Sequence, residues 1–283
     1  MTSTHQLCLT PEYPFTELNR TLSTRDTMYG GSDAHYLSVG LSALGIIEEV
    51  FAGVVPQRIL DLPSGFGRVT RVLRARFPHA AITACDLDRE AVEFCALQFG
   101  ARPVVSEKNF NHLRLDDEFD LIWVGSLITH LPPQQTRDFF AAMSRHMTSS
   151  SKLLVSSHGP SIIPRLREVG YGLAPEAAAG LIYDFEAAGF GYRDYTSGGD
   201  EYGVALTNEH YGISLTCEAW FGSALPACGL KLETYKPRVW DDHHDVVVAR
   251  LAGTEQQSPT KAASSAEGNK GAGVLARLRR WIG

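Results

Sequence analysis

The sequence lacks several features that would place it at once in a common class of protein. Its 283 residues carry 26 lysines and arginines against 32 aspartates and glutamates, a formal net charge of -6. A nucleic-acid-binding protein usually presents a concentrated basic face, so this balance gives no reason to expect a nucleic acid partner. A small-molecule or glycan partner fits the charge better.

Long hydrophobic runs are also missing. No stretch approaches the roughly 18 apolar residues that a membrane-spanning helix needs. A secretory leader has a basic segment followed by an apolar run. The first residues, MTSTHQLCLTPEYPFTE, do not have this pattern. We therefore expect a soluble, cytoplasmic protein.

Paired cysteines are absent as well. The five cysteines are odd in number and widely spaced, at positions 8, 85, 95, 217 and 228, and none forms a CxxC pair. This pattern predicts reduced thiols instead of disulfides or a structural zinc site.

Short apolar runs alternate with helical patterns through the middle of the chain. Strands are predicted at 58–62, 81–85, near Val104, at 119–125 and at 152–158, and helices at 36–51, 68–77, 88–99 and from Pro132. Asp88 is a suitable N-cap and Gly100 a suitable end for the third of these helices. Alternation at these lengths indicates a doubly wound α/β fold around a mostly parallel sheet.

The regular pattern defines one domain with additions. We predict an N-terminal segment and lid helix over 1–57 and the α/β domain over 58–252, with an inserted cap region at about 160–228. The insertion contains an apolar helix around 177–188, an added strand from Tyr202 and a helix near 218–227. LKLETYKP and DVVVARL, joined by RVWDDHH, predict a terminal antiparallel hairpin.

The end of the chain changes in composition. Residues 253–283 are rich in Gln, Ser, Thr, Ala, Gly and Lys, which cannot bury a core. The final GVLARLRRWIG again places apolar and basic residues at helical spacing. We favour a flexible, solvated tail, with peripheral membrane contact through this short helix as the alternative.

The stretch RILDLPSGFGRVTRVL, from Arg58, carries the clearest functional signal. A buried strand ends at Asp61, a turn contains Gly65 and Gly67, and a helical pattern follows. Such a turn lets a ligand approach the backbone at the carboxyl end of a parallel strand. Asp86 follows Gly67 by 19 residues (86 minus 67), near the spacing of an acid that holds ribose hydroxyls. An adenosine-containing ligand is the natural inference.

Three motifs carry a family resemblance. DLPSGFGR, ACDLD and FDLIWVGSLITHLP resemble the first, second-strand and fourth-strand motifs of class I S-adenosylmethionine-dependent methyltransferases, and the similarity extends over about 29–251. One departure is Pro63, where the family usually has its first glycine. The resemblance implies a Rossmann-like methyltransferase fold and S-adenosyl-L-methionine as the cofactor.

The resemblance also implies roles for individual residues. Asp61 and the turn from Gly65 to Gly67 would frame the methionine portion, Asp86 would accept from the ribose hydroxyls, and the segment around Ser106 and Glu107 would border the adenine. Tyr36, with His35, would form a lid. The full set expected at the cofactor is Tyr36, Asp61, Ser64, Gly65, Phe66, Gly67, Arg68, Asp86, Leu87 and Ser106. Arg68 either meets a ligand carboxylate or points to solvent.

Catalytic candidates are the histidines expected at the same edge of the sheet. Methyl transfer from a sulfonium needs mainly an aligned acceptor, and a base only where the acceptor loses a proton. His130 follows the 119–125 strand and can take a proton at neutral pH; the alternative is that it caps the turn before Pro132. His158 and His243 are further catalytic candidates.

Other residues of the hairpin turn, Trp240 and His244, are candidates for acceptor binding. Successive residues of a strand point to opposite faces, so the run His243, His244 and Asp245 is a poor metal cluster and no metal is predicted.

The sequence thus predicts an enzyme that methylates a hydroxyl or similar nucleophile on a small-molecule or carbohydrate-like acceptor. An NAD-dependent oxidoreductase is the first alternative. It is disfavoured by Thr70 at the third glycine position of GxGxxG and by the lack of a Tyr-x-x-x-Lys motif. A non-catalytic adenosyl-binding partner subunit is the second.

Overall fold

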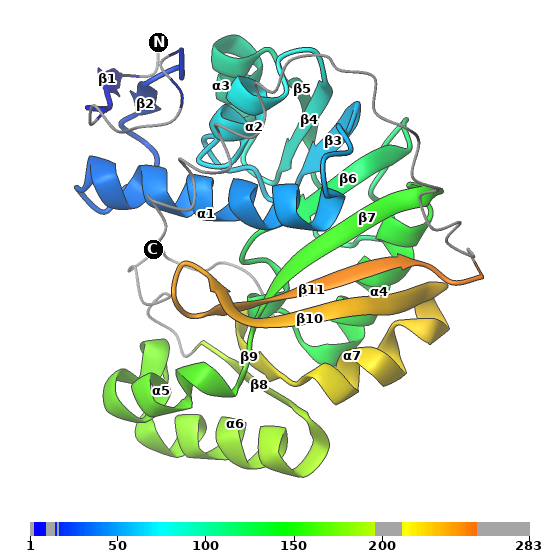
Figure 1. Cartoon of the computed structure of the whole chain (residues 1–283). Helices are drawn as coiled ribbons and strands as arrows, with labels where there is room; N and C mark the ends of the chain where they lie inside the picture. Colours follow the sequence, from blue (N-terminus) through cyan, green and yellow to red (C-terminus); the bar gives the residue numbers. More distant parts are fainter. Residues whose placement is uncertain (1–2, 10–14, 16, 196–210, 254–283) are drawn as a thin grey trace.

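A computed structural model describes residues 3–9, 15, 17–195 and 211–253. Its main sheet has seven strands in the order β10-β11-β7-β6-β3-β4-β5 (Figure 1). The strands are β3 (Arg58–Asp61), β4 (Ala81–Asp86), β5 (Arg102–Val105), β6 (Phe119–Val124), β7 (Met147–His158), β10 (Leu230–Trp240) and β11 (His244–Leu251). Strand β11 pairs antiparallel with both β7 and β10, and the other pairs are parallel. The predicted mostly parallel sheet with a terminal hairpin is confirmed.

Helices cover both faces of this sheet. Helices α1 (Asp33–Phe51), α2 (Thr70–Arg76) and α3 (Arg89–Phe99) pack on one face, and α4 (Pro133–Ser144) and α7 (Glu218–Ala224) on the other. Along β6, Leu121 and Trp123 enter the first core while Ile122 and Val124 enter the second. Because neighbouring residues of a strand point to opposite faces, a strand covered on both sides reads as a continuous apolar run.

Local signals explain most helix ends. The Asp88 side chain accepts a hydrogen bond from the Glu90 backbone at 2.9 Å, and Gly100 ends α3 in the left-handed conformation with φ 61°. These caps are as predicted. Helix α2 begins at Thr70, two residues later than predicted, because the backbone at Gly67 still has a positive φ of 83°.

The inserted region forms a layer with a small core of its own. It contains α5 (Ile163–Val169), α6 (Pro175–Ala188) and a two-stranded antiparallel sheet of β8 (Phe190–Asp194) and β9 (Gly212–Thr216). Side chains such as Leu166, Leu181 and Ile213 fill the space between them. The predicted helix near 218–227 is shorter, since α7 ends at Ala224 and a 3-10 turn starts at Pro226. The strand predicted from Tyr202 lies outside the described residues.

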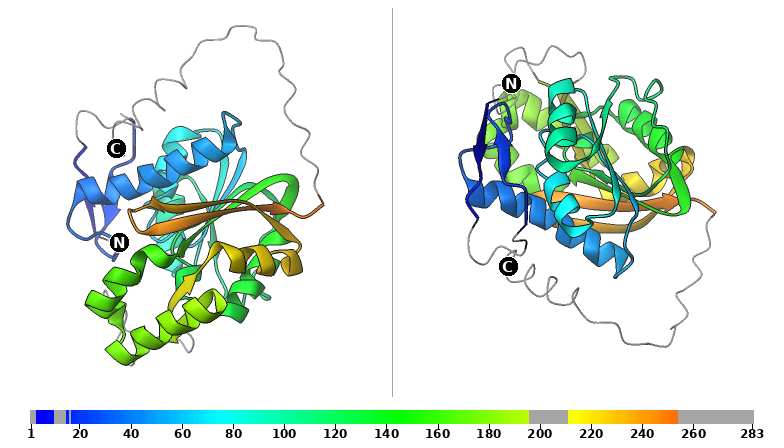
Figure 2. Two further views of the ribbon diagram at one scale, coloured as in Figure 1. Left: turned by 60° about the horizontal axis from the view of Figure 1, so that its bottom comes forward. Right: turned by 90° about the horizontal axis from the view of Figure 1, so that it is seen from above.

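The carboxyl edge of the sheet lies between two additions. The N-terminal hairpin of β1 (Thr4–Gln6) and β2 (Thr21–Ser23) and the helices α5 and α6 lie at the same end of the sheet as the turn between β10 and β11 (Figures 1 and 2). Among the described residues, no helix is both long and apolar enough to cross a membrane. The predictions for the tail after residue 253 lie outside the described part of the chain.

Candidate active site

The turn after β3 has the backbone conformation that its two glycines predict. Gly65 and Gly67 both have positive φ, 49° and 83°, and a Cβ at Gly67 would lie 2.3 Å from the Phe99 ring. A Cβ at Gly65 would meet nothing within 4 Å, so this side of the turn is open. Pro63 does not disrupt the turn, since the Ser64 backbone donates to the Cys85 carbonyl at 3.0 Å. The backbone at Gly65 is therefore accessible to a ligand.

Asp86 closes this turn from the end of β4. Its Oδ2 accepts from the Gly65 backbone N–H at 2.8 Å and its Oδ1 from the Asp88 backbone N–H at 3.0 Å. Burial raises the pKa of Asp86, and these backbone hydrogen bonds partly offset the rise. Each carboxylate oxygen can accept more than one hydrogen bond, so the carboxylate can still receive two hydroxyls. This geometry fits the ribose of an adenosyl ligand.

The other adenosine-side residues border Asp86. The buried Ser106 donates its backbone N–H to the Asp86 carbonyl at 2.7 Å, and the Leu87 side chain next to it is 50% exposed. An exposed leucine beside a polar acceptor can pack against one face of a flat ring such as adenine. The predicted cofactor residues of β3, β4 and the loop after β5 therefore lie around one turn.

Asp61 lies beneath the same turn and is almost fully buried. It accepts a hydrogen bond from the Thr70 hydroxyl at 2.6 Å. Burial raises the pKa of Asp61 to about 7; the Thr70 hydrogen bond and Arg68 oppose the rise, while Asp86 adds to it. A cationic ligand group near Asp61 would favour its ionised form.

Asp61→Asn is expected to raise the stability of the ligand-free protein by a few kcal/mol at pH 8 and by less at pH 5. The folded pKa lies above the usual 3.8, so the native state binds this proton more tightly, and stability falls as the pH rises from about 4 to about 7. Asparagine can accept from Thr70 without carrying the charge. Thermal unfolding of both proteins across this range measures the effect, and a pH-independent difference would contradict it.

Tyr36 and Arg71 anchor the wall behind the turn. Tyr36 is buried, and its hydroxyl donates to Asp26 at 2.6 Å. The buried Arg71 donates to the backbone carbonyls of Gly67, Asn19 and Thr21 at 3.0 to 3.1 Å. Tyr36 is thus held in the wall behind the turn, and its role as a lid on the cofactor stays a prediction. A local pattern does not reveal Arg71, because its partners come from a distant hairpin.

Arg68 and Phe66 contribute to the turn in different ways. The half-buried Arg68 guanidinium lies 6.0 Å from the centroid of the Tyr36 ring, and its charge acts on both Asp61 and His244. It therefore lies between the glycine turn and the histidines. The Phe66 ring packs against Phe94 at a centroid distance of 5.7 Å, so only the backbone of Phe66 can face a ligand.

His130 joins the sheet edge to the inserted region. It ends a 3-10 turn, Ile128–His130, and its Nδ1 lies 2.8 Å from the carbonyl oxygen of Gly212. A carbonyl only accepts, so Nδ1 carries the proton and Nε2 carries the basic lone pair. The ring stacks on Tyr211 with centroids 4.7 Å apart. Helix α4 has no side-chain cap, and the alternative that His130 caps the turn before Pro132 stays open.

Three further histidines gather where β7 ends and the β10–β11 turn begins. The ring of His244 lies 4.8 Å from that of His158 and 4.2 Å from that of His243, between centroids. Burial, and then the neighbouring imidazoles, hold the pKa of His158 and His244 well below the usual range. Trp240 is buried and donates to the Val39 carbonyl at 3.1 Å, so it belongs to the core and not to an acceptor site.

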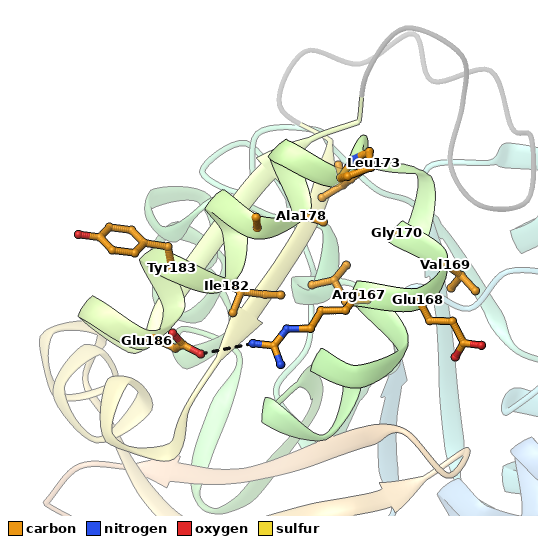
Figure 3. Close-up of a pocket in the computed structure, with 12 residues that line it drawn as sticks. Arg167, Glu168, Val169, Gly170, Leu173, Ala178, Ile182, Tyr183 and Glu186 are labelled. Carbon is orange, nitrogen blue, oxygen red and sulfur yellow. Dashed lines mark ion pairs between the residues drawn. The ribbon is translucent and has the colours of Figure 1, made fainter.

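A separate hollow of about 470 Å³ lies between α5 and α6 (Figure 3). Leu166, Leu173, Ala178 and Ile182 line it, and Arg167 and Glu186 form an ion pair at 4.0 Å beside it. None of the predicted site residues lines this hollow. The residues predicted to carry the chemistry therefore do not belong to this hollow.

Part of the sequence matches a known protein family. The sequence model of a family described as "Methyltransferase domain" matches residues 59–150, which contain the glycine turn, Asp86 and His130. This match is consistent with the class I S-adenosylmethionine-dependent methyltransferase family that the sequence motifs resemble. It is an enzyme, and S-adenosyl-L-methionine is its cofactor, as predicted. No curated protein matches the sequence.

Solved structures of methyltransferases share the fold. A S-adenosylmethionine-dependent methyltransferase from Clostridium acetobutylicum is 16% identical, with a TM-score of 0.52 over 80% of this chain and 95% of that one. The 1,6-didemethyltoxoflavin N1-methyltransferase from Burkholderia thailandensis is 15% identical, with a TM-score of 0.51 over 75% and 78%. The mitomycin 7-O-methyltransferase is 16% identical, with a TM-score of 0.51 over 78% and 55%. At these identities the likeness concerns the fold.

Proposed function

We propose that this methyltransferase modifies a hydroxyl or similar nucleophile on a small-molecule or carbohydrate-like acceptor that binds beside His130. The observation that carries the proposal is the tautomer of His130. Its Nδ1 is committed to the Gly212 carbonyl at 2.8 Å, which places the basic lone pair on Nε2 at the carboxyl edge of the sheet.

The position of each residue at the sheet edge indicates its role in the reaction. When bound, S-adenosyl-L-methionine supplies the electrophilic methyl group. Asp86 and the open face of Gly65 hold the adenosyl end, and Asp61 and Arg68 lie on the side towards the histidines. His130 Nε2 orients the acceptor hydroxyl and takes its proton as the new bond forms, a role worth roughly 100-fold or more in rate.

The inserted region supports selection of the acceptor. Through Gly212 and Tyr211 it contacts His130 directly, and the Ser214 hydroxyl donates to the Ile128 carbonyl at 2.8 Å. Among the fold neighbours, one is named for methylation at nitrogen and another at oxygen, so the acceptor atom depends on this chain's own residues.

Ligand-dependent thermal unfolding provides the first test of this function. S-adenosylhomocysteine is expected to raise the Tm, because a ligand that binds only the folded state adds stability by mass action. NAD at the same concentration is expected to leave the Tm unchanged, and the reverse result would favour the oxidoreductase alternative.

A screen of hydroxylated small molecules, sugars and amines with labelled cofactor then tests the acceptor class. Methyl incorporation only into nitrogen acceptors would contradict the hydroxyl proposal. Cofactor binding without incorporation into any acceptor would favour the partner-subunit alternative.

A further inference from the structure

The three histidines at the β7 and β10–β11 ends have a geometry that the sequence did not predict. Alternation along a strand separates neighbouring side chains, but His243 lies in the turn between β10 and β11, before β11 begins at His244. The third member is His158, which pairs with His244 across the sheet. One ring nitrogen from each of the three lies within 4.8 Å of those of the other two.

Two of these rings have a buried nitrogen that needs a partner. His158 and His244 are 4% and 5% exposed, and within the described part of the chain neither Nδ1 has a hydrogen-bond partner. An unsatisfied buried polar atom costs free energy, so a native structure normally provides a partner for it. Two such atoms beside a third imidazole indicate a shared ligand.

In two of the three rings, the other nitrogen contacts the protein backbone. The His243 Nδ1 donates to the Asp241 backbone carbonyl, which leaves Nε2 as its ligand atom. The His158 ring also interacts with the Ser214 backbone, and because its Nδ1 is the partnerless nitrogen, this contact uses Nε2. Backbone carbonyls in this outer position orient metal-binding imidazoles.

We propose that His158, His243 and His244 bind a divalent transition metal ion, for which Zn²⁺ is the probe in solution. Imidazole nitrogen suits Zn²⁺, and three histidines with one open position form a coordination set typical of reactive zinc sites. With zinc–nitrogen bonds of about 2.1 Å, tetrahedral ligands lie about 3.4 Å apart. To reach that spacing, the three nitrogens, now within 4.8 Å of one another, have to move closer together.

The charges around the three histidines determine the affinity expected for the metal ion. A neutral imidazole is the form that binds metal. The Arg68 charge also acts on His244 and opposes a second cation. The Asp245 carboxylate is occupied by the Tyr235 hydroxyl and the Arg238 backbone. We therefore expect a dissociation constant on the order of 1 μM, weaker than at structural zinc sites.

Zinc binding to the full, tag-free chain tests this site. Calorimetry with ZnCl₂ is expected to show one ion per chain, and CoCl₂ to give the intense visible bands of a four-coordinate cobalt site. His158→Asn, His243→Asn and His244→Asn are each expected to weaken Zn²⁺ binding about 100-fold or more, beyond the usual effect of losing an outer-sphere partner. His79→Asn, an exposed histidine outside the cluster, should bind as the parent does.

Two further measurements separate a loss of zinc binding from a loss of folding or of cofactor binding. Circular dichroism shows that each variant is folded, and the Tm shift with S-adenosylhomocysteine reports the cofactor site separately. Absence of stoichiometric zinc binding by the parent would overturn the proposal and leave the methyltransferase assignment intact. Unchanged zinc binding in a folded triple variant would also overturn it, because the ion would then lie elsewhere.

Discussion

Replacing His130 by alanine is expected to lower turnover by about 100-fold or more while the affinity for S-adenosylhomocysteine stays within a few-fold. His130 follows β6, beyond the turn and the β4 acid that we propose hold the adenosyl end, so its loss should affect the acceptor and the reacting atoms. Single-turnover kinetics with saturating cofactor, together with calorimetry, measures the two quantities independently.

Two conservative variants separate the roles of the His130 ring. His130→Asn can keep the hydrogen bond to the Gly212 carbonyl but has no group near the Nε2 position. His130→Gln can place an amide there, which orients a hydroxyl but cannot accept its proton. If His130 acts as the base, both variants should be slow. Parent-like turnover in both would contradict the proposal and make the contact with Gly212 structural.

Asp86→Ala is expected to weaken binding of S-adenosylhomocysteine by about 10- to 150-fold, equivalent to roughly 1.5 to 3 kcal/mol. The substitution removes a charged acceptor for ribose hydroxyls. It also releases the Gly65 and Asp88 backbone N–H groups, which the carboxylate now holds at 2.8 and 3.0 Å. Both effects act at the adenosyl end.

Asp86→Asn provides the matched control. Its amide has nearly the same shape but only one accepting oxygen, so it cannot satisfy both backbone donors, and an intermediate affinity is expected. The Tm of each variant without ligand reports damage to the turn itself. Equal affinity of the parent and both variants in calorimetry would remove Asp86 from the cofactor site.

Much of the cofactor half of the site follows from the sequence alone. Asp61, Gly65 and Gly67 lie within a few residues of one another, and Asp86 ends the next strand. Parallel strands bring their carboxyl ends to one edge, so this short-range spacing is enough to predict a shared site. The apolar runs likewise predict a sheet covered on both faces, as found around Trp123 and Val124.

Only the tertiary structure could decide the histidine side of the site. The contact between His130 and Gly212 joins residues 82 positions apart, across the inserted region, and no local periodicity encodes such a distance. Arg71 is buried because an N-terminal hairpin offers it backbone carbonyls. His158 meets His244 through the antiparallel register of β7 and β11. The sequence determined the elements and the cofactor edge, whereas strand pairing and packing between distant segments decided which side chains meet there.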